Sequence, residues 1–238
     1  MSTPPLITDV FDLVLGRTCL DCQTPGPALC PTCLAQLRGR TRSVSIPGLV
    51  VPVCAAADYD GIARDVILEY KERGSRSLAP VLGRLLADAA LTVARPHRPS
   101  GCVLIPVPSH RHAPRGFDAL GSVARAAAQA LTRDGLPSRV ERRLRPGPAY
   151  VPMKGLGRGE RQFRISGAFR PAGRTRPAPG DGFVLLVDDV VTTGATASEA
   201  LRTLAATGTR VGGVAAVAAP SRGTPGTIRA PARPTPRP

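Results

Sequence analysis

The feature that most constrains this chain is a run of apolar residues that ends in two acidic residues and a glycine-containing turn. The run covers residues 183 to 187 and lacks the alternation of a half-exposed strand. Uninterrupted runs of this length are typical of strands buried on both faces of a parallel sheet. Helical spacing follows the turn, so we expect an α/β fold in which helices cover a parallel sheet.

The residues after this run combine acidic side chains with phosphate-binding chemistry. Adjacent carboxylates at the end of a buried strand repel each other, and packing does not explain them. They can accept hydrogen bonds from the vicinal hydroxyls of a ribose, while a glycine turn, threonine hydroxyls and the free amides of a helix start suit a phosphate. The alternative is a simple helix cap. The candidate ligand-binding residues are Asp188, Asp189, Val190, Thr192, Thr193, Gly194, Ala195 and Thr196, and the two acids are the candidate catalytic residues.

The rest of the chain predicts one α/β domain of medium size. With 238 residues there is room for one such domain and a small appendage. There is no Trp and only 3% of residues are aromatic, so Ala, Val and Leu must build the core. The predicted elements are a strand within 49–59, helices within 60–74 and 77–94, a strand at 102–108, a helix within 117–135, and a strand, helix and strand within 182–219.

Four cysteines near the N-terminus form two C-x-x-C pairs, Cys19 with Cys22 and Cys30 with Cys33. Four thiolates at this spacing can bind one tetrahedral zinc ion, and a segment so poor in apolar residues needs such help to fold. Free thiols are the alternative. We therefore predict a zinc-ribbon-like module at 1–45, an α/β domain at 46–219 and a disordered tail rich in Pro and Arg at 220–238.

The net charge of +15 raises the alternative of nucleic-acid binding. Almost all of this charge is Arg, since Lys71 and Lys154 are the only lysines, and the cations are spread along the whole chain. A solvated, Arg-rich surface explains this composition as well as a binding patch does. We expect no membrane insertion and no signal peptide, and hence a cytoplasmic protein.

Four stretches in a fixed order resemble the ComF family of bacterial competence-related proteins, which are similar to phosphoribosyltransferases. They are the paired cysteines, YDGIARDVILEYKERG, IPVPSHRHAPRGFD, and GLGRGERQFRISGAF leading to VLLVDDVVTTGAT. The last one matches the pattern of type I phosphoribosyltransferases. The resemblance implies their fold and a site for phosphoribosyl pyrophosphate with Mg²⁺. It places the pyrophosphate in the loop that contains Pro108, Ser109, Arg111 and Arg115.

Some positions depart from that family pattern. Where family members often carry amide side chains, this chain has Asp118, Ala119, Met153 and Arg164. The sequence therefore does not identify the acceptor of the phosphoribosyl group. It does not indicate the oligomeric state either. Two functions remain: phosphoribosyl transfer, or a catalytically silent ligand sensor that contacts single-stranded DNA or a DNA-uptake helicase. Lys71 matches a family position that faces the site, although a lysine at a helix end also suits the helix dipole.

Overall fold

The protein is built around a six-stranded sheet in the order β1-β2-β8-β7-β3-β4. The computed structural model describes residues 18–108, 118–147, 167–173 and 182–221. Within them a separate two-stranded sheet pairs β5 with β6. The strands are β1 Arg42–Ser43, β2 Val53–Asp58, β3 Cys102–Pro106, β4 Ser138–Val140, β5 Leu144–Pro146, β6 Phe169–Pro171, β7 Phe183–Val190 and β8 Gly213–Ala219.

Five of the six strands in the main sheet run parallel, and only β1 is antiparallel to its neighbour. β7 lies at the centre, between β3 and β8, with Leu186 opposite both Ile105 and Val214. The expected α/β architecture with a mainly parallel sheet is therefore confirmed. The predicted apolar run at 183–187 is the inner part of β7, which continues three residues further.

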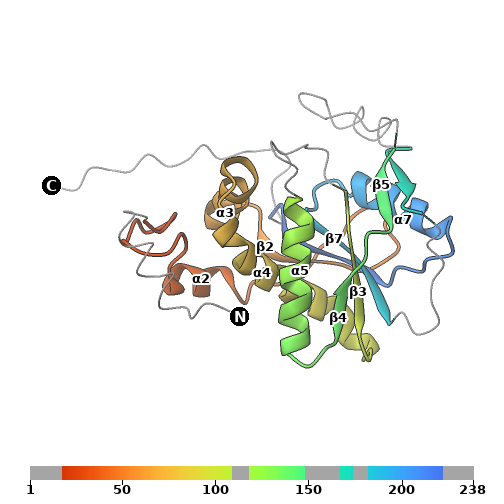
Figure 1. Cartoon of the computed structure of the whole chain (residues 1–238), viewed down its shortest axis with the longest axis horizontal. Coiled ribbons are helices and arrows are strands. Elements are labelled where there is room, and N and C mark those ends of the chain that lie inside the picture. Colours follow the sequence, from red (N-terminus) through yellow and green to blue (C-terminus); the bar gives the residue numbers. More distant parts are fainter. Residues whose placement is uncertain (1–17, 109–117, 148–166, 174–181, 222–238) are drawn as a thin grey trace.

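Helices cover both faces of this sheet. In Figure 1, α3, α4 and α5 lie to the left of β7 and β3, and α7 lies to their right. The helices are α2 Pro31–Leu37, α3 Gly61–Leu68, α4 Ala79–Ala94, α5 Ala119–Arg133 and α7 Ala195–Ala205. A π-turn, Glu69–Arg73, continues α3, and 3₁₀ turns at Arg76–Leu78 and Arg95–His97 flank α4.

Alternate residues of each buried strand enter two separate cores. In β7, Leu185 and Val187 pack with α3, α4 and α5, whereas Val184 and Leu186 pack with α7. Every residue of β8 is buried although most of them are alanine. Small side chains on both faces let the helices approach the sheet closely, so the core contains few large aromatic residues, such as Tyr70 and Phe169.

Two parts of the chain differ from the sequence-based expectation. The helix expected over 60–74 begins and ends near the predicted residues, because Asp60 holds the N-cap position and Gly74 the left-handed conformation that ends it. Its last five residues form the π-turn instead of α-helix. The stretch 136–182, for which no regular structure was expected, contains β4, β5 and β6, whose three residues each are too few to show a period.

One helical segment is long and apolar enough to cross a membrane, contrary to our expectation that none would be. It is Arg76–His97, with 22 residues and a mean hydropathy of 1.4, and 56% of its most apolar window is buried inside the protein. Leu82, Leu86 and Ala90 pack into the core. A core helix satisfies the same test of length and composition, so this segment is weak evidence for a membrane span.

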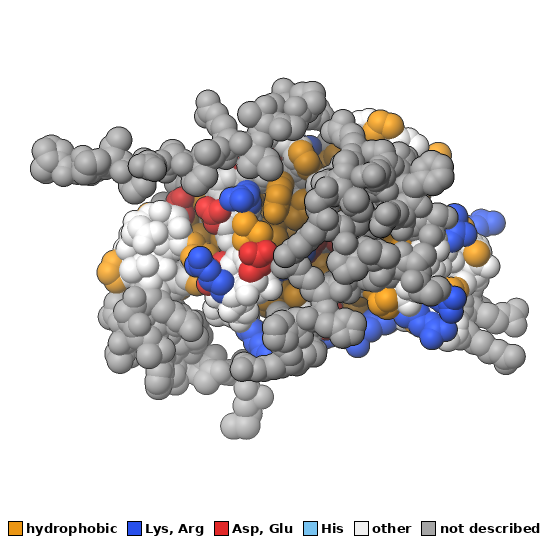
Figure 2. Space-filling model, turned by 90° about the horizontal axis from the view of Figure 1, so that it is seen from above, with side chains coloured by type: hydrophobic (Ala, Val, Ile, Leu, Met, Phe, Trp, Pro, Cys, Tyr) orange, Lys and Arg blue, Asp and Glu red, His pale blue; other side chains and the backbone are white. Residues whose placement is uncertain are grey.

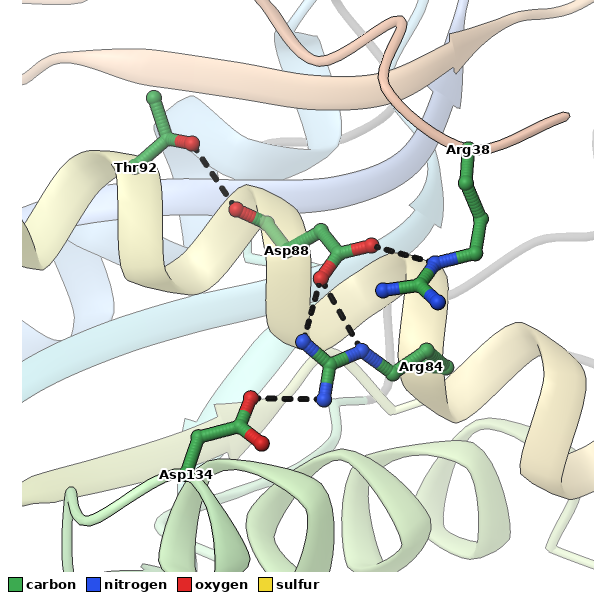
Figure 3. Close-up of polar contacts among 5 residues, drawn as sticks. All are labelled: Arg38, Arg84, Asp88, Thr92 and Asp134. Carbon is green, nitrogen blue, oxygen red and sulfur yellow. Dashed lines mark hydrogen bonds and ion pairs between the residues drawn. The ribbon is translucent and has the colours of Figure 1, made fainter. Parts of the chain in front are cut away.

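An Arg–Asp network joins three helical segments on the outer side of α4 (Figure 3). Arg84 contacts Asp88 at 2.8 Å and Asp134, which follows α5, at 2.6 Å. Arg38, which follows α2, lies 3.5 Å from the other oxygen of Asp88. These contacts connect the cysteine-containing segment to the helical layer of the α/β domain. The division of the chain at residue 45 stays a prediction.

The close packing of α4 against α5 at Gly83 predicts an effect on stability. A Cβ at Gly83 of α4 would lie 2.4 Å from the Cβ of Ala126 in α5, so Gly83→Ala must push the helices apart. Alanine's better helix propensity offsets only part of this cost, and we expect a net loss of about 1–3 kcal/mol in the free energy of unfolding. Urea denaturation measures it, with the exposed Thr92→Ala on the same helix as control. A more stable Gly83→Ala protein would contradict this contact.

Candidate functional site

The candidate site lies where the carboxyl ends of the parallel strands meet at one edge of the sheet. The chain leaves β3 toward α5, which packs on one face, and leaves β7 toward α7, which packs on the other. β3 and β7 are neighbours, so their connections separate at this point. In open α/β sheets such a topological switch point is where ligands bind. Seen from above in Figure 2, acidic and basic side chains lie near apolar ones on the surface.

The two acids lie near the carboxyl end of β7, as the sequence predicts. The backbone amide of Asp189 donates to Oδ1 of Asp188 at 2.8 Å, and the amide of Val190 donates to Oδ1 of Asp189 at 2.8 Å. The other oxygen of Asp189, Oδ2, forms an ion pair with Nζ of Lys71. The side chain of Asp189 is 19% exposed and that of Lys71 is 32% exposed, so the pair sits at the border between core and solvent.

The charges of this group are strongly coupled. Burial raises the pKa of Asp188 well above its ordinary value, and the negative charge of Asp189 raises it further, against the opposing effect of Lys71. For Lys71, burial lowers the pKa and is the largest single effect, but the charge and hydrogen bond of Asp189 together with the charge of Asp188 outweigh it, so the net pKa is raised. Two carboxyl groups, Asp188 and Asp189, therefore share the single positive charge of Lys71. A ligand that brings hydroxyl donors or a cation relieves this imbalance.

The predicted phosphate-binding turn follows directly. Thr192 and Thr193 are exposed, and Oγ1 of Thr193 accepts a long hydrogen bond of 3.4 Å from the amide of Ala195. Gly194 occupies the N-cap position of α7, with no side chain to cap the helix. The first amides of a helix have no intrahelical partner, and the helix dipole favours an anion in front of them. Ala195 and Thr196 in this first turn are half-buried.

Ile46 and Leu49, in the segment between β1 and β2, pack against Gly194 of this turn. Gly194 has a φ of +75°, which disfavours any residue with a Cβ. A Cβ there would also lie 2.3 Å from Cγ2 of Ile46 and 3.1 Å from Cδ1 of Leu49. Glycine is thus required both by conformation and by this contact. The sequence indicated the first reason only.

Of the loop after β3, the structure describes the beginning. Pro106 pairs with Val187, and the amide of Val107 donates to the carbonyl of Val187 at 3.0 Å. Pro108 therefore lies on the same edge of the sheet as the two acids. The predicted pyrophosphate residues Ser109, Arg111 and Arg115 lie outside the described residues, and their roles stay predictions.

Lys71 shares its surroundings with the start of α5. It lines a small cavity of about 10 Å³ together with Asp189, Tyr70 and Ala119. The hydroxyl of the buried Tyr70 donates to the carbonyl of Ala119 at 2.9 Å. Burial raises the pKa of Tyr70 to about 12, so it stays protonated and can donate. The sequence placed Lys71 among the candidates only through the family resemblance, and it gave no sign of the contact between Tyr70 and Ala119.

Asp118, one of the departures from the family pattern, has two structural partners. Its Oδ1 accepts from the amide of Gly121 at 2.9 Å and so caps α5. Its Oδ2 forms an ion pair with Arg142 at 2.5 Å. Asp118 is therefore a helix cap at the edge of the site, which the sequence analysis did not anticipate.

A buried acid of α7 holds the segment that leads into β6. Glu199 is 6% exposed, and its Oε1 accepts from the amide of Gly167 at 2.8 Å. The hydrogen bond from Arg202 lowers the pKa of Glu199, so this carboxylate stays charged. The helix that begins at the predicted phosphate-binding turn thus also holds Gly167, which precedes β6. Its signal in the sequence was weak, because Glu199 falls at an ordinary helical position.

The four N-terminal cysteines lie together, as predicted. Their sulfur atoms all lie within 4.8 Å of one another, and the sulfurs of Cys22 and Cys30 are 3.6 Å apart. Sulfur atoms around a tetrahedral zinc ion are about 3.8 Å apart, given Zn–S bonds of about 2.3 Å. Hydrogen bonds from Thr24 lower the pKa of Cys22 to about 6, which favours the thiolate that binds metals. All six cysteines of the chain are free thiols. The cluster can therefore hold a structural metal ion.

Comparisons with known proteins add little to this geometry. No protein-family model matches the chain, and no curated protein matches it. Among solved structures, the chain is similar to the adenine phosphoribosyltransferase of Rhodothermus marinus, with 21% identity, covering 78% of this chain and 85% of that one. The TM-score is 0.34, too low to support either fold or function. Both must therefore rest on the residues of this chain.

The contact beneath the phosphate turn generates a prediction. Gly194→Ala adds a methyl group at a positive φ and against Ile46, so the turn must shift. We expect a loss of about 1–3 kcal/mol in the free energy of unfolding, from backbone strain together with overpacking. Thermal and urea denaturation measure it. Gly208→Ala, also at a positive φ but with open space around its Cβ, is the control for strain alone. Equal losses in the two variants would argue against the contact with Ile46.

Proposed function

We propose that this protein binds phosphoribosyl pyrophosphate with Mg²⁺ at the carboxyl edge of β7, and that it transfers the phosphoribosyl group to an acceptor. The observation that carries the proposal is one continuous arrangement. Two acids end a central parallel strand, and a glycine turn then opens a helix that faces the same edge. A simple helix cap explains the turn but not the paired acids.

In this proposal the acids hold the sugar. The hydroxyls on C2 and C3 of the ribose donate hydrogen bonds to Asp188 and Asp189, which relieves the repulsion between the carboxylates. The 5-phosphate lies at the turn, where Thr192 and Thr193 offer hydroxyls and the first amides of α7 offer N–H donors. Only Val190 and Val191 separate the acids from the turn in the chain, so both groups lie at the same end of β7.

The acid pair also fits a magnesium ion. Mg²⁺ prefers oxygen donors and binds through one or two carboxylates together with phosphate oxygens of the substrate. Asp188 and Asp189 provide such donors at the correct edge. When bound, the ion neutralises charge on the pyrophosphate.

The transfer itself breaks one bond and forms another at C1 of the ribose. The C1–O bond to pyrophosphate breaks, and pyrophosphate leaves with the electron pair. A nucleophile of the acceptor donates its own pair to C1 and loses its proton to the departing pyrophosphate or to solvent. The acids stabilise the positive charge that develops on the sugar, and positioning supplies much of the rate. The acceptor is unassigned, and the engagement of Asp118 with Arg142 means that this side chain is not freely available to it.

The biological setting is proposed from the order of the sequence motifs. They favour a ComF-type role in competence and DNA uptake in the cytoplasm, with single-stranded DNA or a DNA-uptake helicase as partners. A ligand sensor without turnover is the second candidate function. The involvement of Asp118 in a cap and an ion pair favours it, because family members often carry an amide side chain at this position.

Ligand binding tests the main proposal. Isothermal titration with phosphoribosyl pyrophosphate and Mg²⁺ should show binding to the wild type, and Asp189→Asn and Thr193→Ala should each weaken it at least about tenfold, since each removes a ligand contact worth about 1.4 kcal/mol. Asp65→Asn, on the exposed surface of α3, is the control. Unchanged affinity in both variants would contradict the residue assignment. In a separate assay, release of pyrophosphate in the presence of nucleobases would distinguish an enzyme from a sensor without turnover.

We further propose that the cysteine cluster binds one structural zinc ion. All four positions of a tetrahedral ion would be occupied by Cys19, Cys22, Cys30 and Cys33, which leaves no position for a catalytic water. Cys19 and Cys33 are buried in the core shared with α3 and α4. Metal binding would therefore stabilise both the N-terminal segment and its contact with the α/β domain.

Metal analysis and melting test this site. The purified protein should contain about one zinc ion per chain, and a chelator should lower the melting temperature by about 5 °C or more, because the metal contributes folding free energy. Cys22→Ser with Cys30→Ser should lose the metal. Cys102→Ala, which changes a buried cysteine far from the cluster, should keep it. A metal-free protein whose melting is unaffected by the chelator contradicts the structural role.

A further inference from the structure

Lys71, which contacts the acid pair, lies where the helix before it changes its winding. α3 ends at Leu68, and the five residues Glu69–Arg73 form the π-turn. Such turns insert an extra residue, rotate the following side chains relative to an α-helix, and occur often at functional sites. Tyr70 continues the buried face of α3, and Lys71, next to it in the π-turn, contacts Asp189.

The backbone around Lys71 is fixed on both sides. Tyr70 is 2% exposed and bonds to the start of α5. Glu69 accepts a hydrogen bond from Ser75 at 2.7 Å and pairs with Arg73 at 3.0 Å, and Gly74 ends the turn. The side chain of Lys71 extends from this fixed base on a flexible four-carbon stem. Its ammonium can therefore change partner without any movement of the backbone.

The present partner of Lys71 is one that a ligand can replace. The ion pair with Asp189 is partly exposed on both sides, so a ligand can reach this carboxylate from the solvent. Asp189 is also one of the two acids that the proposed function assigns to the ribose hydroxyls. Ligand binding would thus compete with Lys71 for the same carboxylate.

The chemistry of the ligand supplies the new partner. In phosphoribosyl pyrophosphate, C1 carries the pyrophosphate and is adjacent to C2, whose hydroxyl lies against the acids. The pyrophosphate on C1 would therefore offer Lys71 an anionic partner next to the hydroxyls that replace it on Asp189. The protein uses lysine here, although Lys71 and Lys154 are its only lysines among 32 basic residues. A compact ammonium fits a small space beside the cavity wall better than the broad guanidinium of arginine does.

We propose that Lys71 is a pyrophosphate-binding residue that rests on Asp189 in the ligand-free protein and moves to the ligand when the ribose occupies the acids. The inference depends on the proposed function, since it assigns one part of the same ligand. It distinguishes Lys71 from a structural counter-ion, which would stay on Asp189 throughout.

Two ligands that differ only in the pyrophosphate test this role. Ribose 5-phosphate has the same hydroxyls and 5-phosphate but lacks the group on C1. For Lys71→Met, calorimetry with Mg²⁺ should show affinity for phosphoribosyl pyrophosphate reduced at least about tenfold. Affinity for ribose 5-phosphate should stay within about twofold or increase, because the acids lose a competitor.

Matched variants complete the experiment. Arg64→Met removes a cation from the exposed surface of α3 and should change neither affinity. Lys71→Arg keeps the charge and should retain part of the affinity for phosphoribosyl pyrophosphate, which guards against a folding defect in Lys71→Met. Equal losses for both ligands, or no loss for either, would overturn the role of Lys71 while leaving the proposed function intact. Absence of phosphoribosyl pyrophosphate binding by the wild type would overturn both.

Discussion

The burial of β7 between β3 and β8 is the constraint on which the rest of this structure depends. Both faces of the strand are covered, so its apolar residues cannot be shifted by one position without moving side chains from one core to the other. The parallel register with β3 then fixes where the strand reaches the surface. Asp188 and Asp189 lie at that end of the strand, where β3 has already ended at Pro106, and they are followed by Val190 and the buried Val191.

The electrostatics of the site follow from this placement. A carboxylate at the border of the core is poorly solvated, and two adjacent ones are worse, which is why the pKa of Asp188 is raised. Lys71 balances one charge from outside the strand, and its own pKa is raised by the same contact. Packing alone would not favour two adjacent acids at the border of the core. Unfavourable charge at a topological switch point is what a binding site for a cation or a sugar diol requires.

The sequence predicted best the elements with long, uniform patterns. The run before Asp188, the helices over 77–94 and 117–135, and the cysteine pairs all appear as expected, because burial on one face or both leaves a period in the sequence. β4, β5 and β6 were missed, since three residues carry no period. The π-turn was missed because α- and π-winding share the same residue preferences. The contact of Lys71 with Asp189 joins residues far apart in the chain, and local patterns contain no information about such pairs.

The cysteine segment and the phosphate turn are connected by a short piece of chain. After α2, Arg42 of β1 bonds to Asp58 at 2.7 Å and to the carbonyl of Ala219 at 3.1 Å, which joins the carboxyl ends of β2 and β8. Four residues later Ile46 packs beneath Gly194. The same short piece of chain therefore ties the segment after the cysteines to the sheet and supplies the side chain that packs against Gly194.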